Sequence, residues 1–72
     1  MRFRSAGRLG VEHIGQRVTV RRRLPEGGST DVVGTLEDVT EERFVVRNRH
    51  GESVPIARTE VVASRVIVPP VR

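Results

Sequence analysis

The residues of this sequence that are best suited to bind a charged group are its arginines. All 13 basic residues of the 72-residue chain are arginine, and lysine is absent. A guanidinium group stays charged at any working pH and presents several N–H donors to carboxylate or phosphate oxygens. Five arginines, three of them consecutive, are the candidate binding residues: Arg21, Arg22, Arg23, Arg47 and Arg49. They could neutralise the phosphates of a nucleic acid, or they could pair with carboxylates of the protein itself.

The distribution of charge favours pairing within the fold. Residues 1–24 carry a net charge of +6, residues 25–46 carry −5 and residues 47–72 carry +3, so the net charge of +4 is a small remainder. A basic strand beside an acidic strand neutralises charge across a sheet. We therefore expect a solvated arginine face on the first strand, with Arg17 opposite or diagonal to Glu37.

Catalytic and metal-binding chemistry has few candidates. Cysteine is absent, which removes disulfides, Cys-based zinc sites and thiol catalysis. The two histidines, His13 and His50, stand alone, and none of the four serines lies in a nucleophile-elbow context. The Gly-Gly-Ser-Thr run at 27–30 lacks the lysine and the following helix of a phosphate loop. We expect no catalytic, cofactor or metal site in this chain, and no enzyme activity from it.

The aromatic content excludes two modes of binding. Tyrosine and tryptophan are absent, and the two phenylalanines are Phe3 and Phe44. Grooves for proline-rich peptides and cages for methylated lysine are built from Tyr and Trp faces. Single-stranded nucleic acid is likewise held by bases stacked on aromatic rings. Any nucleic-acid binding would therefore depend on backbone electrostatics and be weak.

The elements that position the arginines are predicted to be strands. Val, Ile and Thr make up 22 of the 72 residues, and apolar and polar residues alternate in several short segments. Five strands are expected, at 16–24, 31–39, 43–48, 53–57 and 61–68, with a single helical turn at 58–60. Five short strands with a helical turn before the last strand predict an all-β fold, a small SH3-like barrel. An OB-fold would need a helix between the third and fourth strands, for which the four-residue turn at 48–51 leaves no space.

Individual residues refine this barrel. Gly34 predicts a bend or a close crossing where the second strand passes between two sheets. Pro55 cannot donate to a ladder, so the fourth strand should be an edge strand. Arg22 interrupts an apolar face and is expected to emerge beyond the barrel rim at the strand end. The expected core consists of Val18, Val20, Leu36, Phe44, Val46, Ile56 and Val66.

The chain divides into three parts on this interpretation. Residues 1–15 form a flexible basic arm with a short ordered piece at Leu9 to Ile14, residues 16–68 form the barrel, and residues 69–72 form a proline-rich tail or the start of a linker. The longest apolar run, 66–68, is far too short for a signal peptide or a membrane span, which predicts a cytoplasmic protein without membrane contact.

Four segments carry a resemblance to a known family. These segments are Val18–Gly27, Thr30–Leu36, Val54–Arg58 and Val61–Val66. Over about residues 15–70 the chain resembles the N-terminal SH3-like domain of actinobacterial GNAT-family N-acetyltransferases. In that family the domain precedes a catalytic domain that binds acetyl-CoA, and Pro69-Pro70 corresponds to the start of the linker. No catalytic domain is present here, so the resemblance transfers neither the transferase activity nor the cofactor to any residue of this chain.

The sequence leaves the function open between two classes. The first is a non-catalytic interaction module that contacts an acetyltransferase domain or another protein. The alternative is a nucleic-acid-binding barrel that uses the arginine face. A third route is addition of a partner strand to the edge strand at 53–57, partly blunted by Pro55. The oligomeric state is not determined by the sequence.

Overall fold

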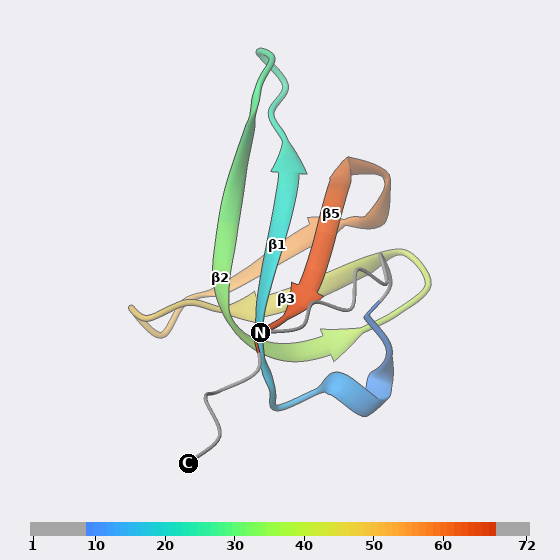
Figure 1. Ribbon diagram of the computed structural model, residues 1–72, viewed down its shortest axis with the longest axis vertical. Coiled ribbons are helices and arrows are strands. Elements are labelled where there is room, and N and C mark those ends of the chain that lie inside the picture. Colours follow the sequence, from blue (N-terminus) through green and yellow to red (C-terminus); the bar gives the residue numbers. More distant parts are fainter. Residues whose placement is uncertain (1–8, 68–72) are drawn as a thin grey trace.

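The computed structural model describes residues 9–67, which form five antiparallel strands and two single-turn helices (Figure 1). The elements are η1 (Val11–His13), β1 (Arg17–Arg23), β2 (Ser29–Val39), β3 (Arg43–Arg47), β4 (Ser53–Ala57), η2 (Arg58–Glu60) and β5 (Val61–Val66). The strand order is β4-β3-β2-β1-β5. The predicted all-β fold is confirmed, including the helical turn before the last strand. The expected tail at 69–72 lies outside the described residues.

The long strand β2 joins the two parts of the sheet. Its first residues pair with β1, from Arg23↔Ser29 to Arg17↔Thr35, and its last residues pair with β3, from Thr35↔Arg47 to Val39↔Phe44. Figure 1 shows β2 curving as it passes from the β1–β5 layer to the β3–β4 layer. A β-bulge between Leu36 and Asp38 accompanies the bend, because an extra residue on one strand increases local twist.

Gly34 lies where β2 changes partners. A Cβ atom at this position would overlap the carbonyl oxygen of Arg47 and lie 3.0 Å from Cγ1 of Val46. No side chain fits there without moving backbone, so the predicted close crossing is confirmed.

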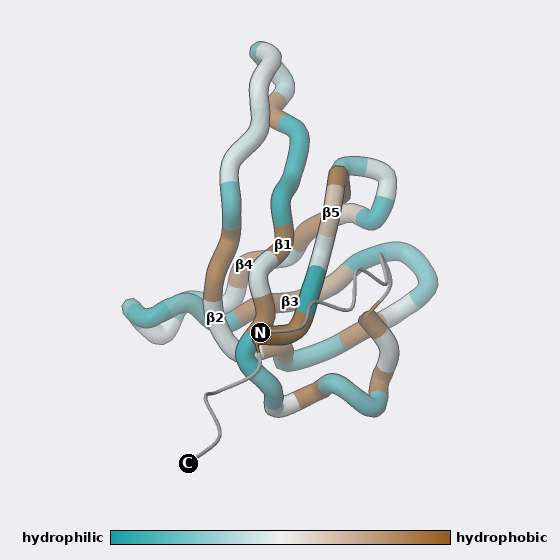
Figure 2. The backbone as a smooth tube through the Cα atoms, viewed as in Figure 1, coloured by the Kyte–Doolittle hydropathy of each residue, from teal (hydrophilic) through white to brown (hydrophobic). Residues whose placement is uncertain are grey.

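The core is built from alternate residues of the strands. Six of the seven expected core residues are fully buried, while Val66 is half-buried and packs against them. Val66 lies on an edge strand, and no second strand among residues 9–67 covers the outer side of β5. Figure 2 shows the apolar residues along the strands and hydrophilic residues at the hairpin tips.

The core also contains Leu9, which is 3% exposed. The sequence prediction omitted it because the segment before the first strand shows no period. The short ordered piece expected at Leu9 to Ile14 is present as η1, which is closed by a hydrogen bond from the His13 N–H to the Gly10 carbonyl at 2.9 Å. The Gly15 N–H then donates to the Leu36 carbonyl at 2.8 Å and attaches this segment to β2. Residues 1–8 of the expected arm lie outside the described residues.

Candidate functional site

Arg21 is engaged by a carboxylate of the neighbouring strand. In the β1–β2 register it lies directly opposite Asp31, and its Nε donates to Asp31 Oδ1 at 2.9 Å. This hydrogen bond lowers the pKa of Asp31, and the charges of Arg21 and Arg65 lower it further. The same contact raises the pKa of Arg21. The positive charge of Arg21 is therefore largely compensated by the carboxylate of Asp31.

Arg22 faces inward and meets a carboxylate of η2. Its side chain is 26% exposed, and Nη2 donates to Glu60 Oε1 at 2.8 Å. The expectation that Arg22 emerges beyond the rim is wrong. The β1–β5 register shifts between Arg21 and Arg22, and the single turn of η2 places Glu60 within reach of the guanidinium.

Arg47 is engaged in a third ion pair, with Glu37. The Arg47–Glu37 nitrogen–oxygen distance is 2.6 Å, and Arg47 Nη1 also donates to the Gly51 carbonyl at 3.3 Å. Ser53 Oγ donates to the other oxygen of the same carboxylate at 2.7 Å. The hydrogen bond from Ser53 is the largest cause that lowers the pKa of Glu37, followed by the one from Arg47.

The predicted placement of Arg17 is confirmed in its diagonal form, because Arg17 lies opposite Thr35, two residues before Glu37. Among residues 9–67, however, Glu37 forms its ion pair with Arg47 and not with Arg17. The β-bulge between Leu36 and Asp38 places Glu37 in a contact with β3 and β4 instead.

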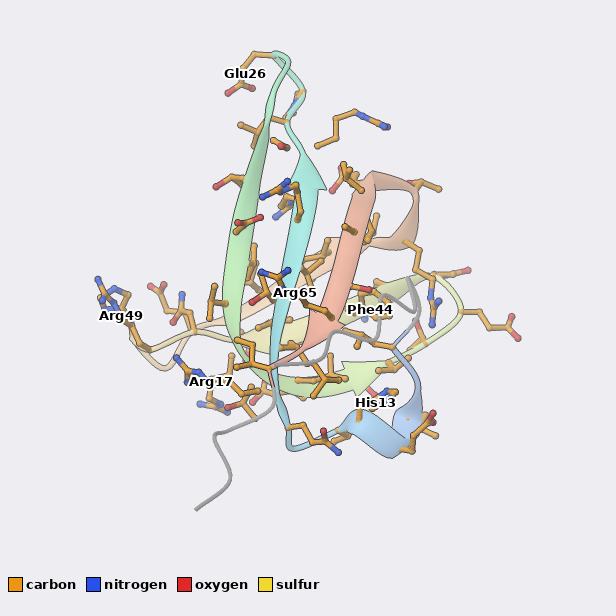
Figure 3. The ribbon with its side chains drawn as sticks, in the orientation of Figure 1. His13, Arg17, Glu26, Phe44, Arg49 and Arg65 are labelled. Carbon is orange, nitrogen blue, oxygen red and sulfur yellow. The ribbon has the colours of Figure 1, made fainter. Side chains whose placement is uncertain are left out.

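The other two candidates, Arg23 and Arg49, form no ion pair with any residue in the described range 9–67. Arg23 ends β1 opposite Ser29, whereas Arg49 lies in the β3–β4 turn, at the far end of that hairpin (Figure 3). Arg47 lies opposite Thr35, and the residue on the other side of Thr35 is Arg17. Arg17 begins β1, whereas the three consecutive arginines end it, so Arg47 lies far from the triplet. The five arginines are thus divided between two parts of the surface and do not form one continuous face.

Both histidines have local roles in turns. The backbone N–H of Gly10 donates to His13 Nδ1 at 2.9 Å, so this nitrogen acts as an acceptor, and its 3.9 Å approach to Glu12 is not an ion pair in that form. His50 lies in the exposed β3–β4 turn, where its backbone N–H donates to Asn48 Oδ1 at 2.9 Å. Within the described part of the chain, no group of three or more His, Asp or Glu side chains could hold a metal ion.

The sequence interpretation missed Arg58, a residue of η2 that contacts both the β2–β3 turn and β3. Its Nε donates to the Thr40 carbonyl at 2.8 Å, and its guanidinium carbon lies 4.6 Å from the centre of the Phe44 ring. The sequence interpretation also missed the Arg21–Asp31 pair, although the position of the turn at Gly27-Gly28 predicts it. Leu24 donates to Gly28 across this turn, and counting outward from that pair brings Arg21 opposite Asp31.

The fold and these contacts define a small all-β domain in which Arg21, Arg22 and Arg47 pair with carboxylates of the domain itself. A family model for the Rv0428c N-terminal Sm-like domain matches residues 12–65. This match spans more than half of the chain, and the chain belongs to that family. No match to a curated protein or to a solved structure was found. Among residues 9–67, no helix is long and apolar enough to cross a membrane.

Proposed function

We propose that this domain is a non-catalytic protein-interaction module, comparable to the SH3-like domain that accompanies a GNAT-family acetyltransferase domain. Its partner on this proposal is an adjacent acetyltransferase domain or another protein, with a cytoplasmic location as the sequence predicts. The observation that carries the proposal is the pairing of Arg21, Arg22 and Arg47 with Asp31, Glu60 and Glu37. Charges paired within the domain contribute little to phosphate binding, because each carboxylate repels the phosphate that its arginine would attract.

Two further observations support a module of this kind. The family description calls the domain N-terminal, which fits a unit followed by another domain. The resemblance to GNAT-associated domains extends over the same strands. The expected absence of catalysis remains part of the proposal and rests on the scarcity of candidate nucleophiles and bases in the sequence.

Binding to a separately produced acetyltransferase domain tests the proposal directly. The reading frame beyond Arg72 supplies that domain if it encodes one, and isothermal titration calorimetry with the 72-residue chain measures the interaction. Saturable binding, without acetyl transfer by the 72-residue chain alone, is the expected result. Acetyl transfer by this chain alone would contradict the proposal.

Nucleic-acid binding is the competing outcome, and Arg17, Arg23 and Arg49 make it testable because they form no ion pair with residues 9–67. Labelled duplex DNA and single-stranded RNA are titrated at low and physiological salt. We expect dissociation constants above roughly 10 μM at physiological salt, as for non-specific contacts. Submicromolar affinity that is lost when these three arginines are replaced by Ala, but kept in an Arg21/Arg22/Arg47 triple Ala variant, would replace the proposal with the nucleic-acid function.

A further inference from the structure

The exposed apolar side chains of the domain come together at one place, beside η1. Among residues 9–67, the large apolar side chains exposed to solvent are Val11, Ile14, Val33 and Val62. Val33 and Val62 lie on β2 and β5, which are separated by β1. Val11 begins η1, and Ile14 follows it and donates its N–H to the Val11 carbonyl at 3.1 Å.

Val11 and Ile14 form one apolar patch on the outside of this turn. Side chains three residues apart lie one above the other in a 3-10 turn, and these two are 66% and 42% exposed. Single exposed apolar side chains are common on protein surfaces, whereas contiguous ones rimmed by polar residues mark interaction sites. The neighbouring residues Glu12 and Gln16 are polar and exposed. We call Val11 and Ile14 the η1 patch.

The η1 patch is held in place by contacts on both sides of it. Before it, Leu9 is buried in the core, and the Gly10 N–H donates to His13 Nδ1 at 2.9 Å. After it, the Gly15 N–H donates to the Leu36 carbonyl at 2.8 Å. A surface that is already fixed in one conformation loses little conformational entropy when it binds. The patch is therefore preorganised for docking.

The chain leaves the sheet close to the η1 patch. The Ile67 N–H donates to the Arg17 carbonyl at 2.8 Å. Arg17 is the third residue after Ile14, and three residues of chain span at most about 11 Å. Figure 1 shows η1 and the end of β5 toward the same end of the molecule, away from the tip of the β1–β2 hairpin. Because the family describes an N-terminal domain, a domain that follows Ile67 begins near this patch.

The charge beside the patch indicates what a docked surface should carry. Glu12 lies within η1, and its side chain is 72% exposed. Among residues 9–67, its carboxylate has no arginine partner. A complementary surface therefore combines apolar side chains with a lysine or arginine opposite Glu12.

We propose that the η1 patch is the surface on which the domain that follows in the same chain docks. That domain supplies apolar side chains over Val11 and Ile14 and a basic side chain beside Glu12. A small contact is sufficient, because a linker holds the two domains at a high effective concentration. The inference rests on the proposed interaction function and names the surface and the partner chemistry for it.

Isothermal titration calorimetry of the 72-residue chain with the domain encoded after Arg72 tests this proposal. The double variant Val11→Ser/Ile14→Ser should weaken binding at least about tenfold, because the apolar contacts are lost. Val33→Ser/Val62→Ser is the matched control, since it removes the other two exposed apolar side chains, and its affinity should equal that of the wild type. Equal affinity of all three proteins, or equal loss in the two double variants, would overturn the proposal.

Cysteine labelling tests the same contact with the two domains joined. The 72-residue chain has no cysteine, so Val11→Cys and Val62→Cys each place one thiol at an exposed position. Their alkylation by iodoacetamide is followed by peptide mass spectrometry, in the 72-residue chain and in the chain that continues through the next domain. Alkylation at position 11 should slow several-fold in the longer chain, and that at position 62 should not change. Equal rates at position 11 in both chains would overturn the proposal.

Two other outcomes exclude the proposed occupant. A reading frame that ends at Arg72 would overturn the proposal, because the docking domain would not exist. Self-association of the 72-residue chain that Val11→Ser/Ile14→Ser alone abolishes would also overturn it, because the occupant would then be a second copy of the chain.

The two proposals fail separately. If the acetyltransferase domain binds Val11→Ser/Ile14→Ser as it binds the wild type, the interaction function stands and the η1 patch is wrong. If the following domain docks through Val11 and Ile14 but is not an acetyltransferase, the patch stands and the accessory role is wrong.

Discussion

The two halves of the curved sheet differ in how completely their groups are satisfied. In the β3–β4 half, Phe44 and Ile56 are buried, Arg58 covers the Phe44 ring, and the carboxylate of Glu37 is held by two donors. In the β1–β5 half, the hydroxyl of Ser64 has no partner and Val62 is 51% exposed. Both halves contribute to the core, since Val18 and Val20 of β1 are also fully buried, but the buried hydroxyl group without a partner among residues 9–67 lies in the β1–β5 half.

This difference concerns the outer strand β5 rather than the whole β1–β5 half. A chain of 72 residues has a limited core, and β1, β2, β3 and β4 all contribute fully buried residues to it. In β5, Val66 is half-buried and Val62 is 51% exposed. Less completely packed elements open more readily than the core of a structure, so we expect β5 to contribute less to stability than the other strands.

The largest expected effect is at Phe44, in the closed half. Phe44→Ala removes a fully buried ring together with its contact to Arg58 and should cost roughly 3 to 5 kcal/mol of unfolding free energy. Such a loss approaches the whole stability of a small domain. Chemical denaturation measures it, and Val66→Ala is the counterpart in the other half, with a smaller cost because Val66 is half-buried. Equal losses at the two positions would remove the distinction between the halves.

Gly34 connects the halves and should give the next largest effect. Gly34→Val should destabilise by about 1 to 3 kcal/mol or more, although valine is the better strand residue, because the added atoms meet the Arg47 backbone. Thr35→Val is the control, since it introduces the same residue at the neighbouring position without adding a heavy atom. A denaturant midpoint that is unchanged or raised by Gly34→Val would show that the two layers are not held as closely as described.

Two serines sharpen the comparison, because they have opposite hydrogen-bonding states. Ser64→Ala removes a buried hydroxyl without a partner and should stabilise by about 1 kcal/mol. Ser53→Ala removes a donor to Glu37 and should lower the melting temperature. Thermal melts of both variants beside the wild type provide the measurement. Destabilisation by Ser64→Ala would indicate that its hydroxyl is satisfied after all.

The smallest expected effect is on the pH dependence of stability. The pKa of Glu37 is lowered in the folded state, so between its folded and unfolded values the unfolded chain binds more protons. The stabilisation is complete above the ordinary glutamate pKa of about 4.3 and is lost as the pH falls through the lower folded value. Glu37→Gln should flatten this part of the profile, as measured by denaturant midpoints between about pH 6 and pH 2. An identical slope for the variant and the wild type would contradict the assignment.

The sequence predicted the fold well because strand alternation, turn composition and Gly34 all depend on local chemistry. The arginine contacts were harder to predict. A bulge after Leu36 accompanies the pairing of Glu37 with Arg47, and a shift in the β1–β5 register accompanies the pairing of Arg22 with Glu60. Neither irregularity leaves a clear mark in the residue pattern. Leu9 was missed for a related reason, since a single buried residue before a one-turn helix has no periodicity.

Amide hydrogen exchange of the full chain tests the difference between β5 and the core strands most directly. The N–H of Leu36, a fully buried residue of β2, donates to the Gln16 carbonyl at 2.9 Å and should exchange only on global unfolding. The N–H of Ile67, which follows β5, donates to the Arg17 carbonyl at 2.8 Å and should exchange faster through local opening of β5. Equal protection of the two N–H groups would contradict the account that β5 is the less completely packed strand.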